Sequence, residues 1–149
     1  MRKFTLLAIV SLSLTAAVDR PDFNGTWQLD AARSQDTKVK AQTMTIRQTE
    51  EDVTLSEVVT DADGKERKSD LQCKTDGDQC KAKQGNVSIW YDGPALVVME
   101  VRRNNSIVVK RRFTMSDDRK SLAVEVTPIA PPGQKPEKMT FVKQGGANP

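Results

Sequence analysis

Short stretches in which apolar and polar residues alternate fill most of this chain, and residues typical of tight turns separate them. In the stretch 106–115, Val109 and Phe113 share an apolar phase that only Arg111 interrupts, and more polar residues fill the other phase. A period of two places successive side chains on opposite faces of a β-strand. No amphipathic helix of convincing length follows the N-terminal leader. The alternation therefore predicts an all-β fold.

The pattern predicts about eight or nine antiparallel strands, at 26–29, 42–48, 52–60, 66–73, 86–91, 95–103, 106–115, 121–127 and 138–143. Each of them could present one apolar side to a common interior. Closing such a ribbon on itself removes exposed strand edges. We therefore predict a single antiparallel up-and-down β-barrel. Gly25 and Trp27 would begin it, because the glycine lets the chain turn sharply and the indole then plugs the closed end.

The N-terminus has the pattern of a cleaved leader. Arg2 and Lys3 precede an apolar run at 4–18, and Thr15-Ala16-Ala17 supplies small residues for cleavage. A membrane anchor is the alternative, but the run is shorter than the roughly 20 residues that a spanning helix needs. We predict a signal peptide at 1–17 and one barrel domain at 18–149, secreted or periplasmic, with no stable membrane span after cleavage.

Two cysteines, Cys73 and Cys80, flank a turn centred on Asp76-Gly77. A two-residue hairpin there would place the cysteines opposite each other. Because an exported chain meets oxidising conditions, we predict a disulfide between them. The spacing is too wide for a zinc site and the chain has no histidine, so we predict no metal.

The composition argues against several classes of function. Without histidine, Ser-His-Asp and Cys-His catalysis are excluded. The carboxylates Glu57, Glu100 and Glu125 are interpreted as solvated residues rather than a catalytic pair. No glycine-rich phosphate loop is present, so we predict neither an enzyme nor a cofactor. Aromatic residues make up 5% of the chain, too few to form stacking platforms, and we predict no nucleic-acid partner.

Three segments, FNGTWQLD at 23–30, WYDGPALVV at 90–98 and RFTMSDDRKSL at 112–122, resemble motifs of bacterial secreted lipocalin-like proteins. The similarity spans nearly the whole chain after the leader and implies a calycin-type barrel. Arg119 departs from the glycine expected in the last motif, and a bridged hairpin is unusual for the family. The resemblance also implies that Arg112 packs over Trp27 at the closed end. The alternation instead places Arg111 inward, so the two readings conflict.

We expect a monomer that binds a small apolar or amphipathic molecule without catalysis. The predicted barrel interior consists of Trp90, Leu96, Val98, Val109, Phe113, Val124 and Phe141. A different class of function is possible for the same fold. The barrel could bind a protein partner through its long connections at 30–40 and 128–136, as a secreted protease inhibitor would.

Overall fold

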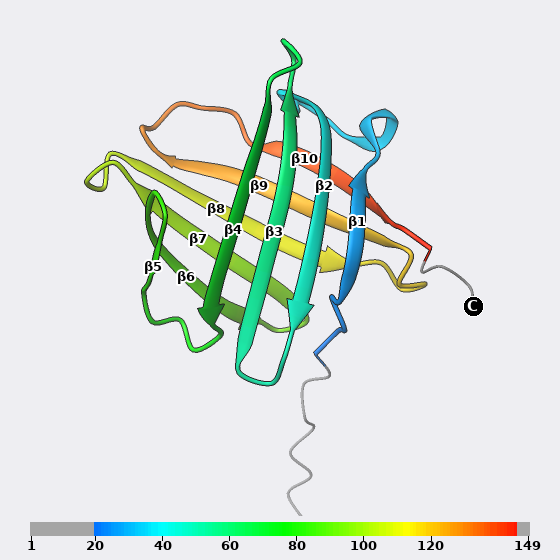
Figure 1. Cartoon of the computed structure of the whole chain (residues 1–149), viewed down its shortest axis with the longest axis horizontal. Helices are drawn as coiled ribbons and strands as arrows, with labels where there is room; N and C mark the ends of the chain where they lie inside the picture. The colour runs from blue at the N-terminus through cyan, green and yellow to red at the C-terminus, as the bar shows by residue number, and fades with distance from the viewer. Residues whose placement is uncertain (1–19, 146–149) are drawn as a thin grey trace, which may run out of the picture.

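Ten antiparallel strands form one continuous sheet that curls into a near-closed barrel (Figure 1). The structure is a computed structural model that describes residues 20–145. The predicted signal peptide at 1–17 lies outside the described residues. Within 20–145, no helix has the length and apolar character needed to cross a membrane.

The strands follow one another with short connections. They are β1 (Gly25–Leu29), β2 (Val39–Gln48), β3 (Asp52–Asp61), β4 (Glu66–Lys74), β5 (Cys80–Ala82), β6 (Gly85–Asp92), β7 (Ala95–Arg102), β8 (Ile107–Met115), β9 (Ser121–Ala130) and β10 (Glu137–Lys143). A single 3-10 turn, η1 (Ala31–Arg33), is the helical part of the described chain.

The sheet order, β4-β3-β2-β1-β10-β9-β8-β7-β6-β5, is an up-and-down meander in which the first and last strands meet. Trp27 of β1 lies opposite Lys143 of β10 on one side and Met44 of β2 on the other. The all-β barrel fold is therefore confirmed. The strand count is ten rather than eight or nine, because β5 is only three residues long and too short to show an alternation.

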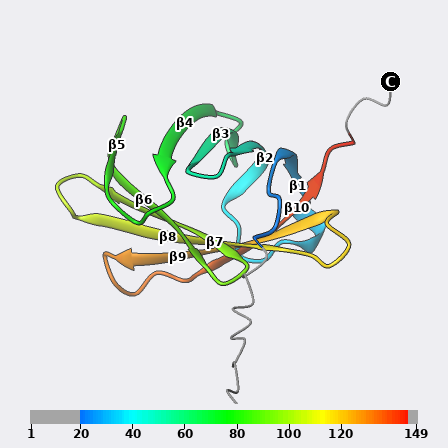
Figure 2. The same cartoon turned by 90° about the horizontal axis from the view of Figure 1, so that it is seen from below.

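The barrel is flattened into two layers. Figures 1 and 2 show β1 to β4 crossing over β6 to β9. Inward residues of both layers pack into one apolar core at the end of the barrel where β1 begins, here called the closed end. The largest fully buried side chains are Trp27, Phe23, Phe113, Phe141, Met44, Ile46, Leu55, Ile89, Leu96 and Leu122.

Trp27 anchors the closed end. It is fully buried, and its indole Nε1 donates a hydrogen bond to the Phe23 carbonyl oxygen at 3.0 Å. The Lys143 ammonium lies 5.5 Å from the centre of the Trp27 rings. Gly25 has a φ of +138°, and a Cβ there would lie 2.9 Å from Cε of Lys143. The strand start therefore needs glycine for its backbone conformation, whereas the flexible end of Lys143 could shift to make room.

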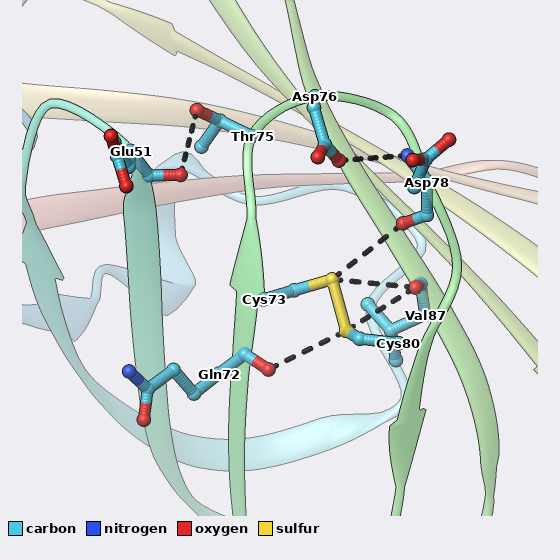
Figure 3. The surroundings of a disulfide bond; sticks show 8 residues. All are labelled: Glu51, Gln72, Cys73, Thr75, Asp76, Asp78, Cys80 and Val87. Carbon is cyan, nitrogen blue, oxygen red and sulfur yellow. Dashed lines mark hydrogen bonds between the residues drawn. A yellow bond between two sulfur atoms is a disulfide. The ribbon is translucent and has the colours of Figure 1, made fainter.

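The two edge strands, β4 and β5, are joined by a disulfide between Cys73 and Cys80 (Figure 3). The bond is the predicted one, but the predicted two-residue hairpin is wrong. Cys80 pairs with Val87 of β6. The connection from Thr75 to Gln79 instead crosses from one edge of the sheet to the other.

The segment between the cysteines pairs with β6 rather than with itself. The Gly77 amide donates to the Ile89 carbonyl oxygen at 2.9 Å, and Asp76 forms an isolated bridge with Trp90. The Asp76 carboxylate accepts the amide hydrogen of Asp78 at 2.9 Å, which bends the chain locally. The disulfide therefore joins the two edges of the sheet, β4 and β5, at the place where the barrel is not closed by strand pairing, here called the seam.

Replacing both cysteines, as Cys73→Ser with Cys80→Ser, is expected to lower the free energy of unfolding by about 2 kcal/mol, the low end for a short closed loop. Urea titration measures the loss. Amide hydrogen exchange should rise more along β4, β5 and β6 than in β1 and β10. An equal rise in exchange in all ten strands would contradict a role of the disulfide at the seam.

Candidate functional site

A cavity of about 380 Å³ occupies the end of the barrel opposite Trp27, here called the open end. Every strand except β1 contributes residues to its lining. The lining includes residues of both edge strands of the sheet, β4 and β5. The apolar part of the lining consists of Val39, Val59, Leu71, Val87, Val109, Val126 and Met139. The polar part that converges on the interior consists of Gln42, Glu57, Glu100, Arg102 and Arg111.

The polar side chains belong to the inward phases of their strands. On β3, Val53, Leu55 and Glu57 follow one another at every second position, and the first two are in the apolar core. On β7, Glu100 continues the phase of Leu96 and Val98. Both strands thus pass from the apolar closed end to a charged residue that contacts Arg111, and the cavity begins there.

Arg111 lies at the centre of this group, which we name the charge cluster: Gln42, Glu57, Glu100, Arg102 and Arg111. Arg111 Nη1 donates to Oε1 of Glu57 at 2.6 Å, and Nη2 lies 3.5 Å from Oε2 of Glu100. Gln42 Nε2 donates to the same Glu57 oxygen at 2.9 Å. Arg102 Nη2 donates to Oε1 of Glu100 at 2.8 Å. Two guanidinium groups therefore face two carboxylates, and their formal charges cancel.

Burial and charge act in opposite directions on these groups. Burial alone would raise the pKa of Glu100, but the positive charges of Arg111 and Arg102 outweigh it and hold that pKa below its ordinary value of 4.5. Burial alone would lower the pKa of Arg111, and the carboxylates of Glu57 and Glu100 raise it instead. Glu100 and Arg111 are therefore both charged at neutral pH.

One donor of the cluster is unused. Arg111 is only 8% exposed, and its Nε has no hydrogen-bond partner among the described residues. A buried donor without a partner costs free energy, and this atom is itself almost inaccessible. No three potential metal ligands converge anywhere in 20–145.

The structure distributes the predicted interior residues over three places. Five of them, Leu96, Val98, Phe113, Val124 and Phe141, are buried in the packed core. Val109 lines the cavity. Trp90 does neither, and its placement inside the barrel is wrong. Val87 and Ile89 take the inward phase of β6, so Trp90 points to the outer side, opposite Val97. Whether the inward residues contact a ligand stays a prediction.

The conflict between the two arginines is resolved in favour of the alternation. Arg111 is inward, and Arg112 is on the outer face, where it forms an exposed ion pair with Asp92. Arg112 therefore does not pack over Trp27, and Lys143 holds that place. A bulge does interrupt the β8–β9 pairing, but it lies between Val108 and Val109 and leaves the phase of Arg111 unchanged.

The carboxylates differ from the prediction as well. Glu57 and Glu100 are buried in the charge cluster, and only Glu125 is on the exposed outer face. The signal for the cluster was present in the sequence, because each polar residue stands in register with the apolar phase of its strand. Extending the period of two past the last apolar residue would have found it.

A second, more open hollow of about 590 Å³ lies outside the barrel at the closed end. Its side chains already satisfy one another. Gln48 Nε2 donates to the Tyr91 hydroxyl at 2.7 Å, and the Arg20 guanidinium lies 4.4 Å from the centre of the Tyr91 ring. The open-end cavity, with apolar walls and the charge cluster in its lining, is therefore the candidate site.

No family model matches the sequence, and no curated protein matches it. Solved structures do match. Fatty-acid-binding protein 1 of Echinococcus granulosus is 10% identical, with a TM-score of 0.56 over 83% of this chain and 98% of that chain. A secretory abundant heat soluble protein of Ramazzottius varieornatus is 11% identical, with a TM-score of 0.59 over 82% and 95%.

The zebrafish ileal bile-acid-binding protein complexed with cholic acid is 12% identical, with a TM-score of 0.57 over 82% of this chain and 98% of that chain. These barrels confirm the calycin-type fold. At such identities the likeness shows the fold and not the ligand. A bacterial source and export stay predictions.

Arg111→Met is expected to lower the free energy of unfolding by about 3 kcal/mol, because it leaves Glu57 buried beside no cation. The matched control is Arg112→Met, the next residue of β8, whose ion pair with Asp92 is exposed and worth at most about 1 kcal/mol. Chemical denaturation at neutral pH measures both. Equal losses in the two variants would contradict the inward position of Arg111.

Glu100→Gln tests the lowered pKa of Glu100. The folded state favours the ionised carboxylate, so its contribution is present above the ordinary pKa of 4.5 and is lost as the pH falls below it. The difference in unfolding free energy between wild type and variant is expected to shrink between pH 7 and pH 3. Wild type and variant share all other carboxylates, so the titration of those groups largely cancels in this difference. A difference that stays constant over the range would refute the assignment.

Proposed function

We propose that this chain binds a small amphipathic molecule inside the barrel and performs no catalysis. The observation that carries the proposal is the open-end cavity itself. Its volume of about 380 Å³ lies within the range of roughly 300–1,000 Å³ that is usual for ligand pockets, near the lower limit. Apolar walls meet a few convergent polar groups, and this combination holds one end of a ligand by burial and the other by hydrogen bonds.

The similar structures support the same class of function. The Echinococcus protein is named for fatty-acid binding, and the zebrafish protein is complexed with cholic acid. Both of those ligand types are amphipathic, with a large apolar part and a polar group. A binding role fits this chain better than catalysis, because Glu57 and Glu100 already pair with guanidinium groups and neither is a free base.

We also propose that the protein is exported, with 1–17 as its leader, and acts as a monomer in the periplasm or outside the cell. The apolar leader supports export, and so does the disulfide between Cys73 and Cys80, because disulfides persist in oxidising compartments.

Protein binding through the connections at 30–40 and 128–136 stays a prediction that no feature of these segments favours. The first is tied to β10, since the Asp30 amide donates to the Thr140 carbonyl oxygen at 2.8 Å and the Gln35 amide to that of Lys138 at 2.6 Å. Strand β2 includes the end of the first connection, 39–40, and β9 includes the start of the second, 128–130. The free loops are therefore shorter than the predicted connections.

Organic extraction of the purified protein, followed by mass spectrometry, is expected to recover a small amphipathic molecule. Nile red, a neutral apolar dye, should bind the extracted protein and become fluorescent. A protein that co-purifies with nothing and binds no dye would contradict the proposed function. A pull-down that instead recovers a protein partner would favour the loop hypothesis.

Val126→Phe is expected to weaken Nile red binding at least tenfold, because Val126 lines the cavity and the larger ring fills part of it. The matched control is Ala123→Phe on the same strand, where residue 123 is exposed on the outer face. Fluorescence titration measures both affinities, and circular dichroism confirms the fold. Equal affinities of the two variants would place the dye elsewhere.

A further inference from the structure

The charge cluster at the inner end of the cavity is already neutral. Arg111 uses one terminal nitrogen on Glu57 and the other on Glu100, and Arg102 shares Glu100 with it. All four charged side chains are at most half exposed, and Arg111, Glu57 and Glu100 are nearly buried. No guanidinium of the cluster is therefore left to neutralise an incoming anion.

A carboxylate that reached the cluster would meet two buried carboxylates as well as the arginines. Burial makes the repulsion between like charges stronger than it is in water. The anion would also lose its own hydration, and no unpaired guanidinium of the cluster would compensate for that loss. Arg67, Lys68 and Lys83 also line the cavity, but they are exposed to solvent, away from the buried part of the cluster. A free fatty acid therefore fits this cavity poorly when its carboxylate lies at the charge cluster.

A hydroxyl group fits the cluster well. It can donate to a carboxylate oxygen of Glu57 or Glu100 and accept from a guanidinium or from the amide of Gln42. A neutral headgroup adds no charge to a balanced site, and Val109, Val126 and Met139 surround the apolar part.

We infer that the cavity selects neutral, hydroxyl-bearing amphiphiles over the corresponding carboxylates, and that Glu57 and Glu100 are the residues that impose this selection. The inference rests on the proposed function and adds to it the charge of the ligand.

The test compares two probes with the same chain length, dodecan-1-ol and dodecanoate, by displacement of Nile red at pH 7.5. Wild type is expected to bind the alcohol at least tenfold more tightly. In Glu57→Gln, which keeps the size and the acceptor oxygen but removes a negative charge, the affinity for dodecanoate should rise at least tenfold. The ratio of the two affinities should therefore shift toward dodecanoate at least tenfold.

Glu100→Gln provides a second variant, so that the test stands if one of the two fails to fold by circular dichroism. Glu125→Gln makes the same chemical change on the exposed outer face of β9 and should leave both affinities unchanged. Tighter binding of dodecanoate than of the alcohol by wild type would overturn the inference and leave the proposed function intact. So would folded Glu57 and Glu100 variants with an unchanged preference.

Failure of both probes and of the dye to bind wild type would have a different meaning. It would remove the proposed function, and the charge selection with it. Binding of both probes with equal affinity would keep the function and overturn only the selection. The outcomes therefore separate the two claims.

Discussion

The ion pair between Arg111 and Glu57 connects β8 to β3, two strands from opposite layers of the flattened barrel. Both groups are buried, and either one alone would be a costly unpaired charge. Their level in the barrel divides the interior. On one side lies the buried apolar cluster around Trp27, and on the other lies the cavity. The position of this pair therefore decides where the core ends and where a ligand could bind.

Closure of the barrel depends on a different device. The first and last strands pair through a regular ladder, so the break in the sheet lies in the middle of the chain, between β4 and β5. The disulfide from Cys73 to Cys80 and the pairing of Gly77 with Ile89 cover part of that break. Because the cavity lining crosses the same seam, this bond holds the wall of the candidate site as well as the fold.

Much of the fold could be predicted from the period of two, because each strand must turn its apolar phase inward. The same rule placed Arg111 correctly, whereas the resemblance to a family motif placed Arg112 incorrectly at the closed end. The hairpin at Asp76-Gly77 was wrong because local turn chemistry does not show that its two arms belong to opposite edges of a sheet. Trp90 was misplaced because its size suggested the core, whereas Val87 and Ile89 already occupied the inward phase of β6.

The candidate site was harder to predict than the fold for a physical reason. A calycin-type barrel needs only inward apolar residues at regular spacing, and structures 10% to 12% identical to this chain meet that need with different side chains. The charge cluster depends instead on which strands bring Glu57, Glu100 and Arg111 to one level, and this follows from register across the whole sheet. A buried excess of either charge would oppose folding, so the balance of the cluster is first a condition for stability. Selection of the ligand by charge is then a consequence of how this interior was made stable.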